Sequence, residues 1–181
     1  MKKYLSIILI SGFLMIFQSC SSQKGADPQA VGMLVGSQDF SFHAQRANPT
    51  NYDVINVMTS LPNAPATRIL DLSGSNYSVD LRKGQLDMAL PYFGRVFNPS
   101  YGNTTQSGYR LTSKDFTVNT SQNKKGKWIV KIKVNDQSTV DEIIMEIYKN
   151  GKAFTSVRSN DRQPISYDGY ITKNEAEKPQ P

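Results

Sequence analysis

Several short stretches of the chain alternate apolar and polar residues, which is typical of strands with one buried and one wet face. The clearest is Trp128–Val134, where Lys131 and Lys133 separate apolar neighbours. A second is Phe40–Ala44, in which the alternation turns His43 away from the apolar face. These patterns predict a mainly β protein.

Turn sequences between the stretches indicate how the strands pair. Gly74-Ser75 and Lys83-Gly84 are both placed as two-residue hairpin loops. They predict a three-stranded meander over residues 70–90 whose apolar residues share one face. The predicted opposite pairs are Leu70 with Val79, Leu72 with Tyr77, Tyr77 with Leu90, Val79 with Met88, and Leu81 with Leu86.

Asn150-Gly151 is the strongest short hairpin signal in the chain and predicts pairing of residues 140–148 with residues 153–157. A final strand is predicted to begin at Ile165 and end at Thr172. Counting outward from a two-residue loop gives the opposite pairs Ile147 with Phe154 and Ile144 with Val157.

The rest of the pattern predicts little helix. Asp27 and Pro28 suit the N-cap and first position of a short helix that continues to Val35. Residues 48–65 contain three prolines and predict an irregular connection with one helical turn near residues 54–58. The predicted fold is a single antiparallel meander of about eight or nine strands, forming a flattened barrel or sandwich, with a short N-terminal helix.

The first twenty residues are arranged like an export signal. Lys2 and Lys3 precede an apolar run over residues 4–17, which meets Gln18-Ser19-Cys20. The run is shorter than the roughly 20 apolar residues of a membrane-spanning helix. The single cysteine stands where a bacterial lipoprotein signal places the residue that is lipidated. We expect a signal peptide over 1–19, a lipidated Cys20 and tether over 20–27, one β-rich domain over 28–172 and a mobile tail over 173–181.

Lipidation at Cys20 would make a lipid bilayer the first partner of this protein. Each buried methylene contributes about 0.8 kcal/mol, so two or three acyl chains would hold it on the membrane. Signal removal leaves 19 basic and 15 acidic residues, a net charge of +4. Much of the excess lies in Lys124-Lys125-Gly126-Lys127, which is more often a solvated turn than a nucleic-acid patch. Nucleic acid is therefore not expected as a partner.

Familiar catalytic chemistry has few residues to use. His43 is the single histidine, and neither a Gly-x-Ser-x-Gly elbow nor a Gly-rich phosphate loop is present in the sequence. Zinc would need carboxylates in place of nearly all His and Cys ligands, so no metal or cofactor is expected. Asp80 and Asp87 face each other in the predicted register, either as a candidate hydrolytic pair or as a solvated face balanced by Arg82 or Lys83.

Aromatic residues around a polar loop form the second candidate site. Residues 96–107 are rich in Asn, Ser, Thr and Gly, and such a long loop suggests a binding role. Aromatic rings beside an arginine can stack on a sugar or bury a partner's side chain. Alternatively, Phe93 and Phe97 close one end of the core. The candidate binding residues are Tyr92, Arg95, Phe97, Tyr101 and Tyr109.

Four features together resemble one family of exported lipoproteins. They are the start of the chain, Leu90–Arg95, Ser107-Gly108-Tyr109 and Arg162–Gly169. The resemblance is to the Bacteroides-type lipoproteins of domain of unknown function family 4251. It implies a single β-rich domain in a Gram-negative cell envelope and carries no established activity. Residues 21–24 lack the acidic run that some such lipoproteins use for surface export, so a periplasm-facing position on the outer membrane is expected.

These observations favour a lipid-anchored envelope protein that binds an envelope protein or glycan without catalysis. One alternative is a carboxylate-dependent hydrolase that uses Asp80 and Asp87. Another is a carrier of an apolar ligand inside a β-barrel, which requires an internal cavity.

Overall fold

The structure is a computed structural model that describes residues 26–62, 66–97, 108–136 and 139–174. Nine strands form one antiparallel sheet in the order β4-β3-β2-β1-β9-β8-β7-β6-β5. The strands are β1 (Phe40–Pro49), β2 (Ser78–Arg82), β3 (Gln85–Pro91), β4 (Gly108–Ser113), β5 (Phe116–Gln122), β6 (Trp128–Val134), β7 (Glu142–Ile147), β8 (Lys152–Arg158) and β9 (Ile165–Thr172). The helices described are α2 (Pro28–Ser37), α3 (Tyr52–Ser60) and α4 (Ala66–Ile69).

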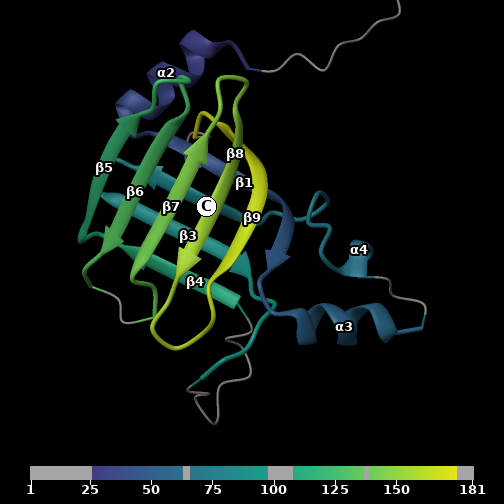
Figure 1. The fold of residues 1–181 in the computed structure, drawn as a ribbon. Coiled ribbons are helices and arrows are strands. Elements are labelled where there is room, and N and C mark those ends of the chain that lie inside the picture. Colours follow the sequence, from purple (N-terminus) through teal and green to yellow (C-terminus); the bar gives the residue numbers. More distant parts are fainter. Residues whose placement is uncertain (1–25, 63–65, 98–107, 137–138, 175–181) are drawn as a thin grey trace, which may run out of the picture.

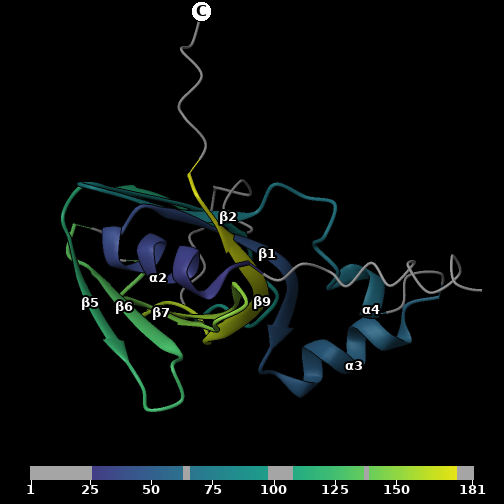
Figure 2. The same ribbon diagram turned by 90° about the horizontal axis from the view of Figure 1, so that it is seen from above.

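The sheet curls into a flattened, nearly closed barrel (Figure 1). Viewed from above, strands β5 to β7 and strands β1 and β2 lie on opposite sides of helix α2 (Figure 2). Strands β4 and β5 are the two edges of the sheet, and no ladder joins them within the described residues. The predicted fold, about eight or nine antiparallel strands in a flattened barrel or sandwich with a short N-terminal helix, is therefore confirmed.

The meander fixes which turns lie together. Neighbouring strands along the chain pair with each other in β2–β4 and in β5–β9, and β1 joins the two runs by pairing with both β2 and β9. Within β5–β9, successive turns therefore alternate between the two ends of the barrel. The β5–β6 and β7–β8 turns lie at the end covered by α2, and the β6–β7 and β8–β9 turns lie at the other end (Figure 1).

Alternate residues of the strands fill the barrel. In β6, Val130, Ile132 and Val134 are buried while Lys131 and Lys133 are exposed, as the sequence pattern predicts. The inward residues of β3 and β7 are buried in the same way. The apolar face of every central strand thus belongs to one core.

Helix α2 covers one end of this core. Its predicted N-cap is confirmed, because the Asp27 carboxylate accepts a hydrogen bond from the backbone N–H of Gln29 at 3.1 Å. Val31 and Val35 are 0% and 1% exposed and face the core. Helix α3 is longer than the single turn predicted and lies beside the barrel with α4 (Figure 1). None of the described helices combines the length and apolar character needed to cross a bilayer.

The hairpin predicted at Lys83-Gly84 is confirmed, and the one at Gly74-Ser75 is wrong. Leu81 lies opposite Leu86 and Val79 opposite Met88, as predicted. The segments on either side of Gly74, in contrast, do not pair with each other, because both bond to β1. The backbone N–H of Leu72 donates to Gln45 O at 2.8 Å, and the backbone N–H of Ala44 donates to Tyr77 O at 2.9 Å. Both segments therefore bond to β1, and residues 73–76 form the turn that separates them.

The Asn150-Gly151 hairpin exists, but its predicted register is wrong by one residue. Ile147 lies opposite Ala153 and Ile143 opposite Val157, because the loop has three residues instead of two. Gly151 ends this loop with a φ of 80° and donates its N–H to Tyr148 O at 3.0 Å. A loop of this kind ends in a left-handed residue, which glycine adopts without steric cost.

Candidate functional site

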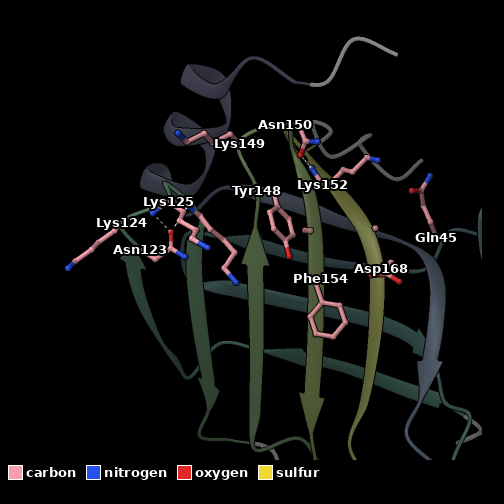
Figure 3. Close-up of a pocket in the computed structure, with 13 residues that line it drawn as sticks. Gln45, Asn123, Lys124, Lys125, Tyr148, Lys149, Asn150, Lys152, Phe154 and Asp168 are labelled. Carbon is pink, nitrogen blue, oxygen red and sulfur yellow. Dashed lines mark hydrogen bonds between the residues drawn. The ribbon is translucent and has the colours of Figure 1, made fainter. Parts of the chain in front are cut away.

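A groove of about 1340 Å³ lies on the outer face of the barrel, at the end where α2 lies (Figure 3). Among the described residues, its lining includes neither the predicted carboxylate pair nor the predicted aromatic binding residues. Its lining is basic and partly aromatic, and we call it the lysine groove. The residues used below are Lys124, Lys125, Lys127, Lys149, Lys152, Tyr148, Phe154 and Asp168.

The β5–β6 turn supplies three of the lysines. Asn123 holds this turn, because its side-chain oxygen accepts from the backbone N–H of Lys125 at 3.0 Å and of Lys127 at 2.9 Å. Gly126 has a φ of 79°, a left-handed conformation that favours glycine. The local sequence therefore folds into a tight turn that presents lysines on both of its flanks.

The β7–β8 turn supplies the other two lysines. Asn150 shapes it by accepting the backbone N–H of Lys152 at 3.2 Å. The aliphatic part of Lys149 lies across the neighbouring turn, so that a Cβ added to Gly126 would overlap Lys149 Cε. The two turns, about 25 residues apart in sequence, thus form one basic surface at the rim of the barrel (Figure 3).

Most of this positive charge is not neutralised. Lys127 pairs with Glu146 at 2.6 Å, and the hydrogen bond from this lysine to the carboxylate raises the pKa of Lys127. The other four lysines form no ion pair with a carboxylate of the described residues. Asp168 lines the groove and accepts a hydrogen bond from the Asn48 amide at 2.7 Å. Positive charges gathered in this way attract anions over roughly a Debye length.

Two aromatic rings form the apolar part of the groove. Tyr148 follows β7 and is 45% exposed, and Phe154 lies half-buried on β8. The Lys127 ammonium lies 5.7 Å from the centre of the Tyr148 ring. An anionic ligand with an apolar face could contact lysines and rings together.

The predicted aromatic residues divide between the interior and the surface. Tyr109 is 2% exposed and packs edge-on against Tyr92, with ring centres 5.5 Å apart. The Tyr92 hydroxyl lies within hydrogen-bond distance of the backbone carbonyls of Arg95 and Gln163, at 2.9 and 3.1 Å. Arg95 and Phe97 are exposed, and Tyr101 lies outside the described residues, as does Cys20. The binding role of these residues stays a prediction.

Arg162, which the sequence did not single out as a site residue, organises this cluster. Its guanidinium lies 5.1 Å from the centres of both the Tyr92 and the Tyr109 rings and forms a salt bridge with Asp161 at 3.0 Å. Burial raises the pKa of Tyr109 and of Tyr167 well above the usual tyrosine value. Burial alone would raise the pKa of Asp161, but hydrogen bonds from Arg162 and Ser159 lower it overall. The cluster fixes the 91–97 segment against the β8–β9 loop.

The predicted carboxylate pair is in register. Asp80 lies opposite Asp87 on the outer face, where both line a shallow pocket. Asp87 accepts hydrogen bonds from Gln85 and Thr112, both at 2.7 Å, and pairs with Arg82 at 3.4 Å. Arg82 is thus one of the two cations expected to balance the pair, and the roles of Asp80 and Asp87 stay predictions. Among the described residues, no group of three or more His, Cys, Asp or Glu side chains is placed to hold a metal ion.

Comparison with known proteins gives a family and a related fold. The family model described as "Domain of unknown function (DUF4251)" matches residues 23–171. A crystal structure of a DUF4251 family protein from Bacteroides eggerthii DSM 20697 is similar, with a TM-score of 0.51 and 12% identity, over 83% of this chain and 90% of that chain. A search of curated proteins returned no match. Because the family model spans most of the sequence, the chain belongs to the DUF4251 family.

Proposed function

We propose that this protein is a lipid-anchored binding module of the cell envelope, which holds an anionic envelope component in the lysine groove. The observation that carries the proposal is the convergence of five lysines from two turns beside Tyr148 and Phe154. Exposed lysines with few acidic neighbours favour negatively charged partners. The sequence predicts an envelope protein or glycan as the partner, and the lysine groove favours a partner that carries negative charge.

The proposed location rests on the start of the chain. The charged and apolar segments before Cys20 have the layout of a lipoprotein signal. A periplasm-facing position on the outer membrane agrees with the absence of acidic residues over 21–24. Replacing Cys20 with serine in cells should move the protein from the membrane fraction to the soluble fraction. Retention of the variant in the membrane fraction would contradict the anchor.

The groove is the better binding candidate because its charges are available. In the aromatic cluster, the side chains of Arg162, Tyr92 and Tyr109 pack against one another. In the carboxylate pair, Asp87 is bonded by three neighbouring side chains. Four lysines of the groove, in contrast, have no described ionic partner. The alternative function, a hydrolase that uses Asp80 and Asp87, would depend on an Asp87 carboxylate that already bonds to these three neighbours.

Binding can be measured on the mature chain, residues 20–181, with Cys20 replaced by serine. Dextran sulfate is the anionic probe and neutral dextran is the control. We expect binding to dextran sulfate only, and we expect added salt to weaken it because the contacts are between solvent-exposed charges. Removing three groove charges, in the variant K124Q/K125Q/K149Q, should lower the affinity.

The matched control removes three charges elsewhere. Lys83, Lys114 and Lys133 are exposed and do not line the groove. The variant K83Q/K114Q/K133Q has the same net charge as the groove variant and should bind almost as tightly as the parent chain. Equal losses in the two variants would mean that only net charge matters, and the groove would not be the site.

A further inference from the structure

We propose that the anionic component is the membrane itself: the lysine groove lies against the phospholipid headgroups of the bilayer that carries the lipid anchor. This inference rests on the proposed function, since it assigns a partner to the same groove and assumes an anchor at Cys20. Three observations support it: where the chain enters the barrel, how charge is distributed between the two ends, and how the aromatic ring of Tyr148 is placed.

The chain enters the barrel at the rim of the groove. The backbone N–H of Ala26 donates to the carbonyl of Asn150, a groove residue, at 3.1 Å. The contact is close, because a Cβ added to Gly151 would lie 2.9 Å from the Cβ of Ala26. The β7–β8 turn therefore fixes Ala26, the first residue that the structure describes, beside Lys149 and Lys152.

The distance from this point to a lipidated Cys20 is short. Residues 20–26 extend over at most about 20 Å, since an extended chain gains about 3.3–3.6 Å per residue. A tether of this length keeps the β7–β8 end of the barrel near the bilayer. The lysines of the two turns then lie within reach of the headgroups, where the surface potential is strongest.

Charge is distributed unequally between the two ends of the barrel. The end that carries the tether has the five groove lysines, of which Lys127 is paired with Glu146, and one nearby aspartate, Asp27. The opposite end, reached by the β4–β5, β6–β7 and β8–β9 turns, has Lys114 and the aspartates Asp115, Asp136, Asp141 and Asp161, of which Asp161 is paired with Arg162. The unpaired charges are therefore mainly positive at the first end and mainly negative at the second, so an anionic surface would orient the barrel with its groove toward the lipid.

The groove also contains a tyrosine, a side chain that is favoured at the interface between membrane and water. Tyr148 is 45% exposed beside the lysines and has both an apolar ring and a polar hydroxyl. Tyrosine with flanking lysine is the combination that places an apolar body in the headgroup region while its polar ends stay wet. Tyr148 would therefore lie among the headgroups while the lysines contact phosphate.

The test uses the mature chain with Cys20 replaced by serine, so that any binding comes from the protein surface. Sedimentation is measured with vesicles of phosphatidylcholine alone and of phosphatidylcholine mixed with phosphatidylglycerol. We expect binding only to the mixed vesicles. Since each lysine near an anionic membrane contributes about fivefold, K124Q/K125Q/K149Q should bind on the order of 100-fold more weakly. The control K83Q/K114Q/K133Q should lose far less.

Each outcome bears on a different statement. Binding to dextran sulfate without preference for the mixed vesicles would overturn the membrane assignment and leave the groove as a site for a soluble anion. Binding to neither probe would overturn both proposals. Circular dichroism of the variants checks that they are folded, and a groove variant that is folded but still binds the mixed vesicles as the parent does would also overturn the assignment.

Discussion

At the scale of single residues, Gly126 shows how backbone geometry builds the groove. Its φ of 79° costs other residues about 1–2 kcal/mol, and a Cβ there would displace the end of Lys149. We predict that Gly126→Ala lowers the free energy of unfolding by about that amount, measured by urea denaturation. Gly36→Ala is the control: this exposed helix residue has open space around it, and the change should stabilise α2 by roughly 0.5–1 kcal/mol.

Tyr109 should make the fold sensitive to alkaline pH. Its burial raises the pKa of its hydroxyl above the ordinary value of 10.0. Above pH 10 the unfolded chain loses this proton while the folded chain keeps it, so stability that is complete below pH 10 falls as pH rises. Each such tyrosine contributes a loss of up to about 1.4 kcal/mol per pH unit.

Tyr109→Phe should therefore make the decline in unfolding free energy above pH 10 less steep. Tyr52→Phe is the control, because Tyr52 is 80% exposed. Urea denaturation at a series of alkaline pH values measures both slopes. Identical slopes for the parent chain and Tyr109→Phe would show that this hydroxyl does not carry the effect.

At the scale of elements, α2 acts as the cover of one barrel end. Val31 and Val35 are buried, whereas Met33 on the same helix is 69% exposed. Val31→Ala removes two methyl groups from a close-packed site and should cost about 2 kcal/mol. Met33→Ala should change the unfolding free energy by less than about 0.5 kcal/mol. Equal effects in thermal unfolding would mean that α2 is not packed as described.

The register of paired strands could be predicted from the sequence where the turn between them allows only one loop length. Lys83-Gly84 gave the correct register because a two-residue loop leaves no freedom in the pairing. At Asn150-Gly151 the same counting was wrong by one residue, since the left-handed Gly151 closes a three-residue loop. At Gly74-Ser75 the chain turns between two segments that both bond to β1, and no local sequence pattern distinguishes such a turn from a hairpin.

The groove could not be read from either turn alone. Taken alone, Lys124-Lys125-Gly126-Lys127 indicates a solvated turn, as such a charged run in a single loop usually is. Its partner, Lys149, comes from a turn two strands later. The signal that could have joined them is topological: in an antiparallel meander every second turn lies at the same end, so the β5–β6 and β7–β8 turns must be neighbours.

At the scale of the whole molecule, the described part of the barrel has no ladder between β4 and β5. Strands β1 and β9 form ladders on both sides, whereas β4 and β5 each form one within the described residues. Amides without a ladder partner need no opening of the sheet to exchange with solvent. Hydrogen exchange followed by mass spectrometry should therefore show at least about tenfold faster exchange for alternate amides of β5 than for β1.

Comparing the exchange rates of the edge strands β4 and β5 with those of the central strands shows whether the barrel stays open in solution. β8 lies between β7 and β9 and serves as a second protected reference. If β4 and β5 were as protected as β1 and β8, their free edges would be paired, either with each other or with another chain. Dilution separates those two cases, because protection by a second chain decreases with concentration and a closed barrel does not change.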